Sequence, residues 1–240
     1  MKQLQPVYFA LDFPTGNEAI DFLQVNRLDA IPVKVGMELF YKEGPPMIQR
    51  LKERGHPIFL DLKLHDIPAT VGRAMRNLAS LDVDVVNVHA QGGAAMMRAA
   101  VQGVEEGATN ERPILLAVTM LTSTDQEMVE REMLLDNSIP KVVRHYTNLA
   151  KNSGVDGVVC SVHEAELVKN TAMLALTPGI RLGSGDIHDQ KRIASPDVAR
   201  ERGSDSIVVG RAIREADDPH VTYHQIKEAF THEIDHKGFN

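Results

Sequence analysis

Short apolar segments recur along the 240-residue chain, and a longer segment with helical character follows most of them. The segments are apolar throughout instead of alternating with polar residues, which is typical of parallel strands covered by helices. The expected strands are 7–11, 32–35, 58–64, 83–88, 114–119, 157–160, 172–177 and 206–209. The expected helices are 16–25, 43–54, 67–81, 94–106, 139–152 and 221–230.

Strands and helices in this order are compatible with a closed (β/α)₈ barrel or with an open, doubly wound sheet. A dinucleotide-binding open sheet would carry G-x-G-x-x-G after its first strand, and this chain has no such motif there. No repeat, low-complexity tract or linker divides the sequence. We therefore expect an α/β protein with a single TIM-barrel domain over residues 1–240.

Charge and cysteine content narrow the classes of partner. The net charge is −7 and both signs are spread along the chain, which argues against nucleic acid or a membrane surface as a partner. The single cysteine, Cys160, excludes an intrachain disulfide and suits a reducing compartment. The N-terminal apolar run has five residues, too few for a secretory signal, and no run approaches the length of a membrane span. We expect a cytoplasmic protein.

Two charged residues interrupt the apolar strand at 58–64. Residues two apart on a strand point to the same side, so Phe59, Asp61 and Lys63 share one face and the leucines share the other. Burying a carboxylate and an ammonium together is costly unless they are paired. The pair is therefore either a structural ion pair or part of a functional site.

Charged residues also stand at the ends of the neighbouring strands. Asp12 ends the first strand and Lys34 lies in the second, while Asp66 follows the third strand and is alternatively an N-cap of the next helix. In a (β/α)₈ barrel the carboxyl ends of the strands form the active-site mouth. We expect these charges to meet Asp61 and Lys63 there.

The loops after the seventh and eighth strands have features of a phosphate site. They contain TPGIR at 177–181, DQKR at 189–192, and Gly210 followed by Arg211. Loops at this position in such barrels often bind phosphate, and an arginine guanidinium can donate to two phosphate oxygens at once. The alternative for Arg181 and Arg211 is a solvated surface charge.

Other suggestive motifs have simpler interpretations. Residues 161–164 (SVHE) fit a capping box, and Cys160 on a strand fits a core position. The pairs His65-Asp66 and His188-Asp189 lack the spacing of a metal site, and Met96-Met97 fit a helix core. We predict no metal site.

Taken together, these motifs resemble one family along nearly the whole chain. The matching segments are ALDF at 10–13, Lys34 in VKVGMELF, DLKLHD at 61–66, Thr122 in LTST, TPGIR at 177–181, DQKR at 189–192 and VVGRAI at 208–213. The chain is similar to orotidine 5′-phosphate decarboxylases of the bacterial type.

The resemblance implies a homodimer that converts orotidine 5′-phosphate to UMP and CO₂ in de novo pyrimidine biosynthesis, without metal or cofactor. It assigns Lys63 as the proton donor, and Asp61 as the residue beside the substrate carboxylate that positions Lys63. Lys34 and Asp12 would hold ribose hydroxyls and complete the charge array. Asp66, the fourth residue of the catalytic set, would reach into the neighbouring subunit's site together with Thr70. The remaining expected contacts are Thr122 with the pyrimidine, Pro178 in the wall, and Arg181, Gln190, Gly210 and Arg211 with the phosphate.

Two alternatives stay open. A sugar-phosphate decarboxylase or aldolase of the same scaffold would share Asp-x-Lys-x-x-Asp but would use Mg²⁺, and such relatives carry a glutamate on the second strand where this chain has Lys34. A non-catalytic nucleotide-binding barrel would keep the phosphate loops but would have little reason to keep Lys63.

Overall fold

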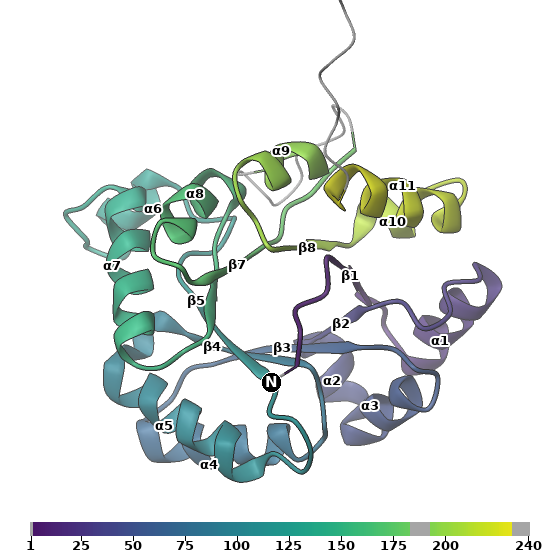
Figure 1. Cartoon of the computed structure of the whole chain (residues 1–240), viewed down its shortest axis with the longest axis horizontal. Coiled ribbons are helices and arrows are strands. Elements are labelled where there is room, and N and C mark those ends of the chain that lie inside the picture. Colours follow the sequence, from purple (N-terminus) through teal and green to yellow (C-terminus); the bar gives the residue numbers. More distant parts are fainter. Residues whose placement is uncertain (1, 183–192, 232–240) are drawn as a thin grey trace, which may run out of the picture.

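Eight parallel strands close into a barrel in chain order in the computed structural model, which describes residues 2–182 and 193–231. Figure 1 looks down this barrel, with the strands inside and the helices around them. The strands are β1 (Val7–Ala10), β2 (Val33–Gly36), β3 (Ile58–Leu64), β4 (Val85–His89), β5 (Ile114–Val118), β6 (Gly157–Val159), β7 (Leu174–Thr177) and β8 (Ser206–Val209). The ring closes because β1 pairs with both β2 and β8. The predicted (β/α)₈ TIM barrel is confirmed, whereas a single domain over all 240 residues stays a prediction.

Helices follow every strand and cover the outside of the barrel. They are α1 (Gly16–Val25), α2 (Met37–Glu43), α3 (Pro45–Lys52), α4 (Pro68–Ala79), α5 (Gly93–Gly107), α6 (Gln126–Arg131), α7 (Ile139–Asn152), α8 (Ala165–Lys169), α9 (Pro196–Glu201), α10 (Arg211–Arg214) and α11 (Pro219–Thr231). Short 3₁₀ turns, η1 (Ala90–Gly92) and η2 (Val162–Glu164), precede α5 and α8. None of the helices in the described residues is long and apolar enough to cross a membrane.

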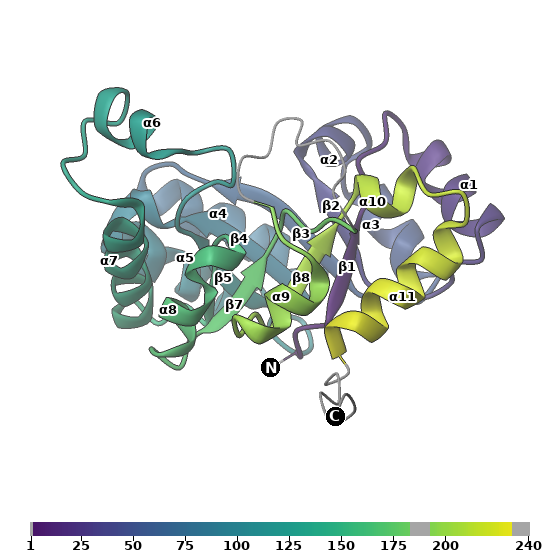
Figure 2. The same ribbon diagram turned by 90° about the horizontal axis from the view of Figure 1, so that it is seen from above.

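The helix expected at 43–54 is wrong as a single element. Gly44 has a φ of +68°, which ends α2, and Pro45 then begins α3 at its first turn. The loop expected after β5 also contains a helix, α6, whose first turn is capped when the Asp125 side chain accepts from the N–H of Met128. Figure 2 shows α6 standing away from the barrel beside its mouth.

The strand residues separate into two apolar layers. On β1, Tyr8 and Ala10 point into the barrel, whereas Val7 and Phe9 pack against the helices. The interior layer consists of Tyr8, Ala10, Phe59, Val85, Ile114, Leu116, Val118, Val159, Leu176 and Val208. Because side chains alternate along a strand, the inward positions of β1 and β3 continue to Asp12 and to Asp61 and Lys63. The barrel interior therefore leads directly to the charged mouth.

Three aspartates fasten the opposite end of the barrel. Asp84, Asp156 and Asp205 each directly precede a strand, namely β4, β6 and β8. Their carboxylates accept backbone N–H groups from β3, β5 and β7 over 2.6, 2.8 and 2.8 Å. Hydrogen bonds to an ionised acceptor are stronger than neutral ones. These side chains therefore tie three pairs of neighbouring strands together where the strands begin.

Helices α4 and α5 approach each other very closely through glycine. A Cβ on Gly103 would lie 2.1 Å from the carbonyl oxygen of Gly72, and one on Gly107 would lie 2.1 Å from that of Arg76. A side chain at either glycine would therefore force the helices apart. Since α4 directly follows β3, this contact fixes the helix that leaves the charged strand.

Candidate active site

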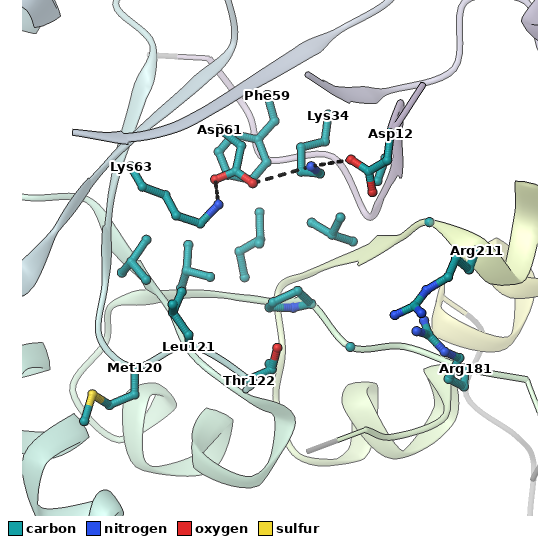
Figure 3. Close-up of a pocket in the computed structure, with 18 of the residues that line it drawn as sticks. Asp12, Lys34, Phe59, Asp61, Lys63, Met120, Leu121, Thr122, Arg181 and Arg211 are labelled. Atoms are coloured by element: carbon teal, nitrogen blue, oxygen red, sulfur yellow. Dashed lines mark hydrogen bonds and ion pairs between the residues drawn. The ribbon is translucent and has the colours of Figure 1, made fainter. Parts of the chain in front are cut away.

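Four charged side chains of alternating sign form a row along one wall of the barrel mouth (Figure 3). Lys63 Nζ donates to Asp61 Oδ1 over 2.7 Å. The other oxygen of Asp61 lies 3.6 Å from Lys34 Nζ, which in turn donates to Asp12 Oδ1 over 3.2 Å. The row crosses from β3 to β2 and ends just after β1, so three neighbouring strands supply it. The structure thus brings together four of the five charges expected at the mouth.

The electrostatics of the row keep its buried members ionised. Burial alone would raise the pKa of Asp61, which is only 7% exposed, but Lys34, Lys63 and their hydrogen bonds hold the pKa below its ordinary value. Burial likewise lowers the pKa of Lys34, yet Asp61 and Asp12 outweigh burial and raise it. Asp61 and Lys34 therefore depend on their charged neighbours to stay ionised while buried.

Asn87, on β4, forms hydrogen bonds with two residues of this row, and it was not identified from the sequence as a site residue. Its side-chain N–H donates to Asp61 Oδ1 over 2.7 Å, and its carbonyl oxygen accepts the backbone N–H of Lys63 over 2.8 Å. The side chain is buried at 1% exposure. The available signal was a single amide in the otherwise apolar start of β4, VVNV, which did not by itself indicate a partner.

A cavity of about 400 Å³ opens beside the row at the carboxyl ends of the strands. Its lining includes five cationic side chains and two carboxylates, although the whole chain has a net charge of −7. The charged lining residues are Asp12, Lys34, Asp61, Lys63, Arg181, Arg211 and Arg214. Apolar residues from the barrel interior, among them Val118 and Leu176, form its floor. A cavity of this size and charge suits an anionic small molecule.

Arginines gather on the side of the cavity away from the row. Figure 3 shows Arg181, which follows β7, next to Arg211, which begins α10 after β8. Arg214 was not anticipated; its guanidinium donates to the backbone carbonyl of Asp12 over 2.6 Å and to Glu215 over 2.9 Å. It therefore links α10 to the end of β1. The cavity consequently has a cationic end and a mixed-charge wall.

Three further expected residues also line the cavity, and two others lie outside it. Thr122, Pro178 and Gly210 are in the lining. Asp66 and Thr70 lie outside it, on the loop after β3 and in the first turn of α4. Gln190 lies, with the rest of 189–192, outside the described residues.

The N-cap interpretation of Asp66 is wrong. The N-cap of α4 is Ile67, whose side chain makes no capping hydrogen bond. Asp66 is exposed, and its carboxylate accepts a hydrogen bond from the N–H of the next residue, Ile67, over 2.6 Å. Because Pro68 occupies the first helical position, the N-cap position falls on Ile67, one residue after Asp66. Asp66 is thus left at the surface.

For residues 161–164, Cys160 and Met96-Met97 the structure agrees with the simpler interpretation, whereas His188-Asp189 lies outside the described residues. Ser161 is the N-cap of η2: its hydroxyl accepts from the N–H of His163 and donates to the Glu164 carboxylate, so the motif caps this turn. Cys160 is buried, and so are Met96 and Met97. Within residues 2–182 and 193–231, no group of three or more His, Cys, Asp or Glu side chains could hold a metal ion.

The fold and the site together define a (β/α)₈-barrel protein whose mouth is suited to an anionic small molecule. The chain belongs to the orotidine 5′-phosphate decarboxylase / HUMPS family, whose model matches residues 5–226. It is 53% identical over 229 residues to the orotidine 5′-phosphate decarboxylase of Bacillus cereus (strain G9842), covering 93% of this chain and 96% of that protein. The Bacillus cytotoxicus enzyme of the same name is 54% identical over 224 residues, 91% and 94% of the two chains.

Solved structures agree with this assignment. The crystal structure of orotidine 5′-phosphate decarboxylase from Lactobacillus acidophilus has a TM-score of 0.83 at 37% identity, covering 95% of this chain and all of that one. An uncharacterized conserved protein from Geobacillus kaustophilus has a TM-score of 0.82 at 44% identity, covering 94% and 100%.

Proposed function

We propose that this chain catalyses the decarboxylation of orotidine 5′-phosphate to UMP and CO₂ in de novo pyrimidine biosynthesis, with neither metal nor cofactor. The family and the names of its relatives support the reaction. The observation that carries the proposal is the row Lys63–Asp61–Lys34–Asp12 on one wall of a cavity whose other side is rich in arginine.

The substrate has two anionic ends, and the cavity offers a place for each. Arg181 and Arg211 are suited to the phosphate, because a guanidinium binds two oxygens in one plane. We assign Gly210 and Gln190 to the same end. The substrate carboxylate then lies toward the row, over the ammonium of Lys63.

The middle of the substrate falls between these ends. We assign Asp12 and Lys34 to the ribose hydroxyls, since one accepts hydrogen bonds and the other donates them. Thr122 would bind the pyrimidine edge and Pro178 would form the wall beside it. All four residues line the cavity.

Lys63 is assigned the central step. The bond between pyrimidine C6 and the carboxylate breaks, CO₂ leaves, and the electron pair stays on C6 in the plane of the ring. The ring π-system cannot delocalise that pair, so a fixed ammonium stabilises it and then donates a proton to C6. Two unit charges 4 Å apart at an effective dielectric of 20 interact by about 4 kcal/mol. This lowers the barrier substantially but leaves most of it to other effects, among them binding energy from the phosphate.

Asp61 has two consequences for this step. Its carboxylate holds the Lys63 ammonium at one side of the cavity through a 2.7 Å hydrogen bond. It also places a negative charge beside the substrate carboxylate, and that repulsion is relieved when CO₂ departs. We assign Asp61 to the catalytic set on both grounds.

We further propose a homodimer in which Asp66 and Thr70 serve the neighbouring subunit's site. Asp66 is exposed and lies outside its own cavity. The next residue, Ile67, is 66% exposed, an unusual position for a large apolar side chain unless another surface covers it. Burial of Ile67 against a second copy would bring the adjacent Asp66 into the same interface.

Two further expectations complete the proposal. We place the protein in the cytoplasm, in keeping with the lone, buried Cys160. We expect no nucleic-acid or membrane partner, since the chain is acidic overall and the cations of the mouth line a cavity.

The Mg²⁺-dependent sister activity is disfavoured by the surroundings of Asp61. A divalent cation needs oxygen ligands, whereas both oxygens of this carboxylate face ammonium groups, from Lys63 and Lys34. A cation bound there would repel both lysines.

The test is a spectrophotometric assay of the purified protein with orotidine 5′-phosphate, with and without EDTA. We expect turnover that EDTA leaves unchanged. Activity lost with EDTA and restored by Mg²⁺ would indicate the sister activity. Tight UMP binding with no turnover would indicate a non-catalytic nucleotide-binding barrel.

A further inference from the structure

Lys63 has an unusual backbone. Its φ is +50°, a left-handed conformation that side chains other than glycine rarely adopt, and it occurs within β3. Such conformations persist where the surrounding structure enforces them, and they concentrate at functional sites. The residue that carries the ammonium is therefore held in place by something beyond ordinary strand pairing.

The pairing of β3 with β4 breaks at this point. Leu60 lies opposite Val86 and Leu64 lies opposite Val88, with a register shift between them. Three residues of β3, at 61–63, consequently face the single residue Asn87. This is a bulge, and bulges commonly re-aim a side chain next to an active site.

The side chain of Asn87 fills the gap left by the bulge. Its carbonyl accepts the backbone N–H of Lys63 and its amide N–H donates to Asp61 Oδ1. An amide offers one acceptor and one donor group in fixed geometry, so both contacts are satisfied by one orientation. Because the side chain is buried, water cannot replace either partner.

We propose that Asn87 is a positioning residue, which holds the Lys63 backbone and the Asp61 carboxylate in register so that the Lys63 ammonium meets C6 of the substrate. The inference rests on the proposed decarboxylase function for its chemical outcome. Its structural part, that the Asn87 amide enforces the left-handed backbone at Lys63, is independent of that function.

Two substitutions separate the two contacts. Asn87→Asp keeps the shape and the acceptor for the Lys63 N–H, but replaces the donor to Asp61 with a second carboxylate. Asn87→Ala removes both contacts. The matched control is Ser206→Ala, which deletes a hydrogen bond to the Gln5 carbonyl at the far end of the barrel. Each variant is measured for kcat, KM, UMP affinity, thermal midpoint and the pH profile of kcat.

We expect kcat to fall by roughly 100-fold in Asn87→Ala, the loss typical of a reacting group displaced by about 1 Å. KM and UMP affinity should change by less than about threefold, because the phosphate contacts remain. The acid limb of the kcat profile should move to higher pH in both variants. Burial raises the pKa of Asp61, and the lysines together with the Asn87 donor hold it down, so losing that donor raises it. Ser206→Ala should match wild type in kcat.

Unchanged kcat in both folded variants, or a rise in KM alone, would overturn the proposal. So would crystal structures in which Lys63 keeps its positive φ and its Nζ position without the amide. If Asn87→Ala does not fold, Asn87→Asp carries the same test through its kcat and pH profile. If wild type does not turn over orotidine 5′-phosphate, the proposed function fails, while the structures of the variants still decide whether Asn87 sets the Lys63 backbone.

Discussion

Asp61 places one carboxylate oxygen 3.6 Å from Lys34 and the other 2.7 Å from Lys63, so a single anion separates two ammonium groups. Without it two ammonium groups of like charge would lie on the same wall with no anion between them. The carboxylate therefore does more than pair with one neighbour: it allows two cations to be fixed side by side. The site depends on this arrangement.

Replacing Lys63 by alanine should lower kcat for orotidine 5′-phosphate by several orders of magnitude while the protein stays folded. The side chain borders the cavity and is 22% exposed, so its loss empties little of the core. Steady-state assays and a thermal unfolding scan measure the two effects. Lys141→Ala, an exposed lysine on α7, is the control and should retain wild-type activity. A Lys63→Ala variant with near wild-type turnover would remove this residue from the chemistry.

Mixing two inactive variants should restore activity if sites are shared between subunits. Lys63→Ala and Asp66→Ala chains, allowed to exchange, form mixed dimers in which one site has both an intact lysine and an intact aspartate. We expect up to about a quarter of wild-type activity in a fully exchanged equimolar mixture, because half the dimers are mixed and each has one complete site. Mass spectrometry of differently tagged chains verifies exchange. Exchange without recovery would confine Asp66 to its own subunit.

Asp82 should stabilise the fold down to unusually low pH. Burial raises its pKa, but the hydrogen bonds and positive charges of Lys2 and Lys52 together lower it to about 2. A depressed carboxylate pKa adds stability that is complete above the unfolded value near 4 and is lost as pH falls toward 2. The difference in unfolding free energy between wild type and Asp82→Asn should therefore shrink over that interval in urea titrations.

The control for this effect is Asp136→Asn, at an exposed position in the loop before α7. Because the side chain is exposed, this variant should differ little from wild type in unfolding free energy. An Asp82→Asn difference that stays constant from pH 5 to pH 2 would contradict the assignment.

Gly103→Ala should destabilise the protein by about 1–3 kcal/mol, the usual cost of forcing extra volume into a packed contact. The new Cβ would lie 2.1 Å from the Gly72 carbonyl oxygen, so α4 and α5 must separate. Urea unfolding of this variant is compared with Gln102→Ala, an exposed neighbour on α5. Equal stability of the two variants would show that the helices can separate at no cost.

Much of the fold and half of the site follow from local rules. Each of the eight expected strands is present with ends that differ by two residues or fewer. Alternation along a strand correctly placed Phe59, Asp61 and Lys63 on one face, because the inward and outward sides of a barrel strand have period two. Lys34 and Asp12 then followed from the common position of strand ends.

The remaining features depend on contacts between distant segments. Asn87 meets Lys63 only because of a bulge, and a bulge has no reliable signature in an apolar strand. Arg214 reaches the end of β1 across the barrel closure, between residues about 200 apart in the chain. The break at Gly44 was readable in principle from the glycine and the two prolines after it, but the helical periodicity on both sides concealed it.

The carboxylates of Asp84, Asp156 and Asp205 brace the end of the barrel opposite the cavity. The residues that anchor the strands thus lie at one end of the barrel, and the residues of the candidate active site lie at the other. The loops at the cavity end can therefore accumulate substitutions without weakening the strands that carry them. A barrel built in this way can acquire new substrates through substitutions in the loops at one end, while the other end keeps the chain folded.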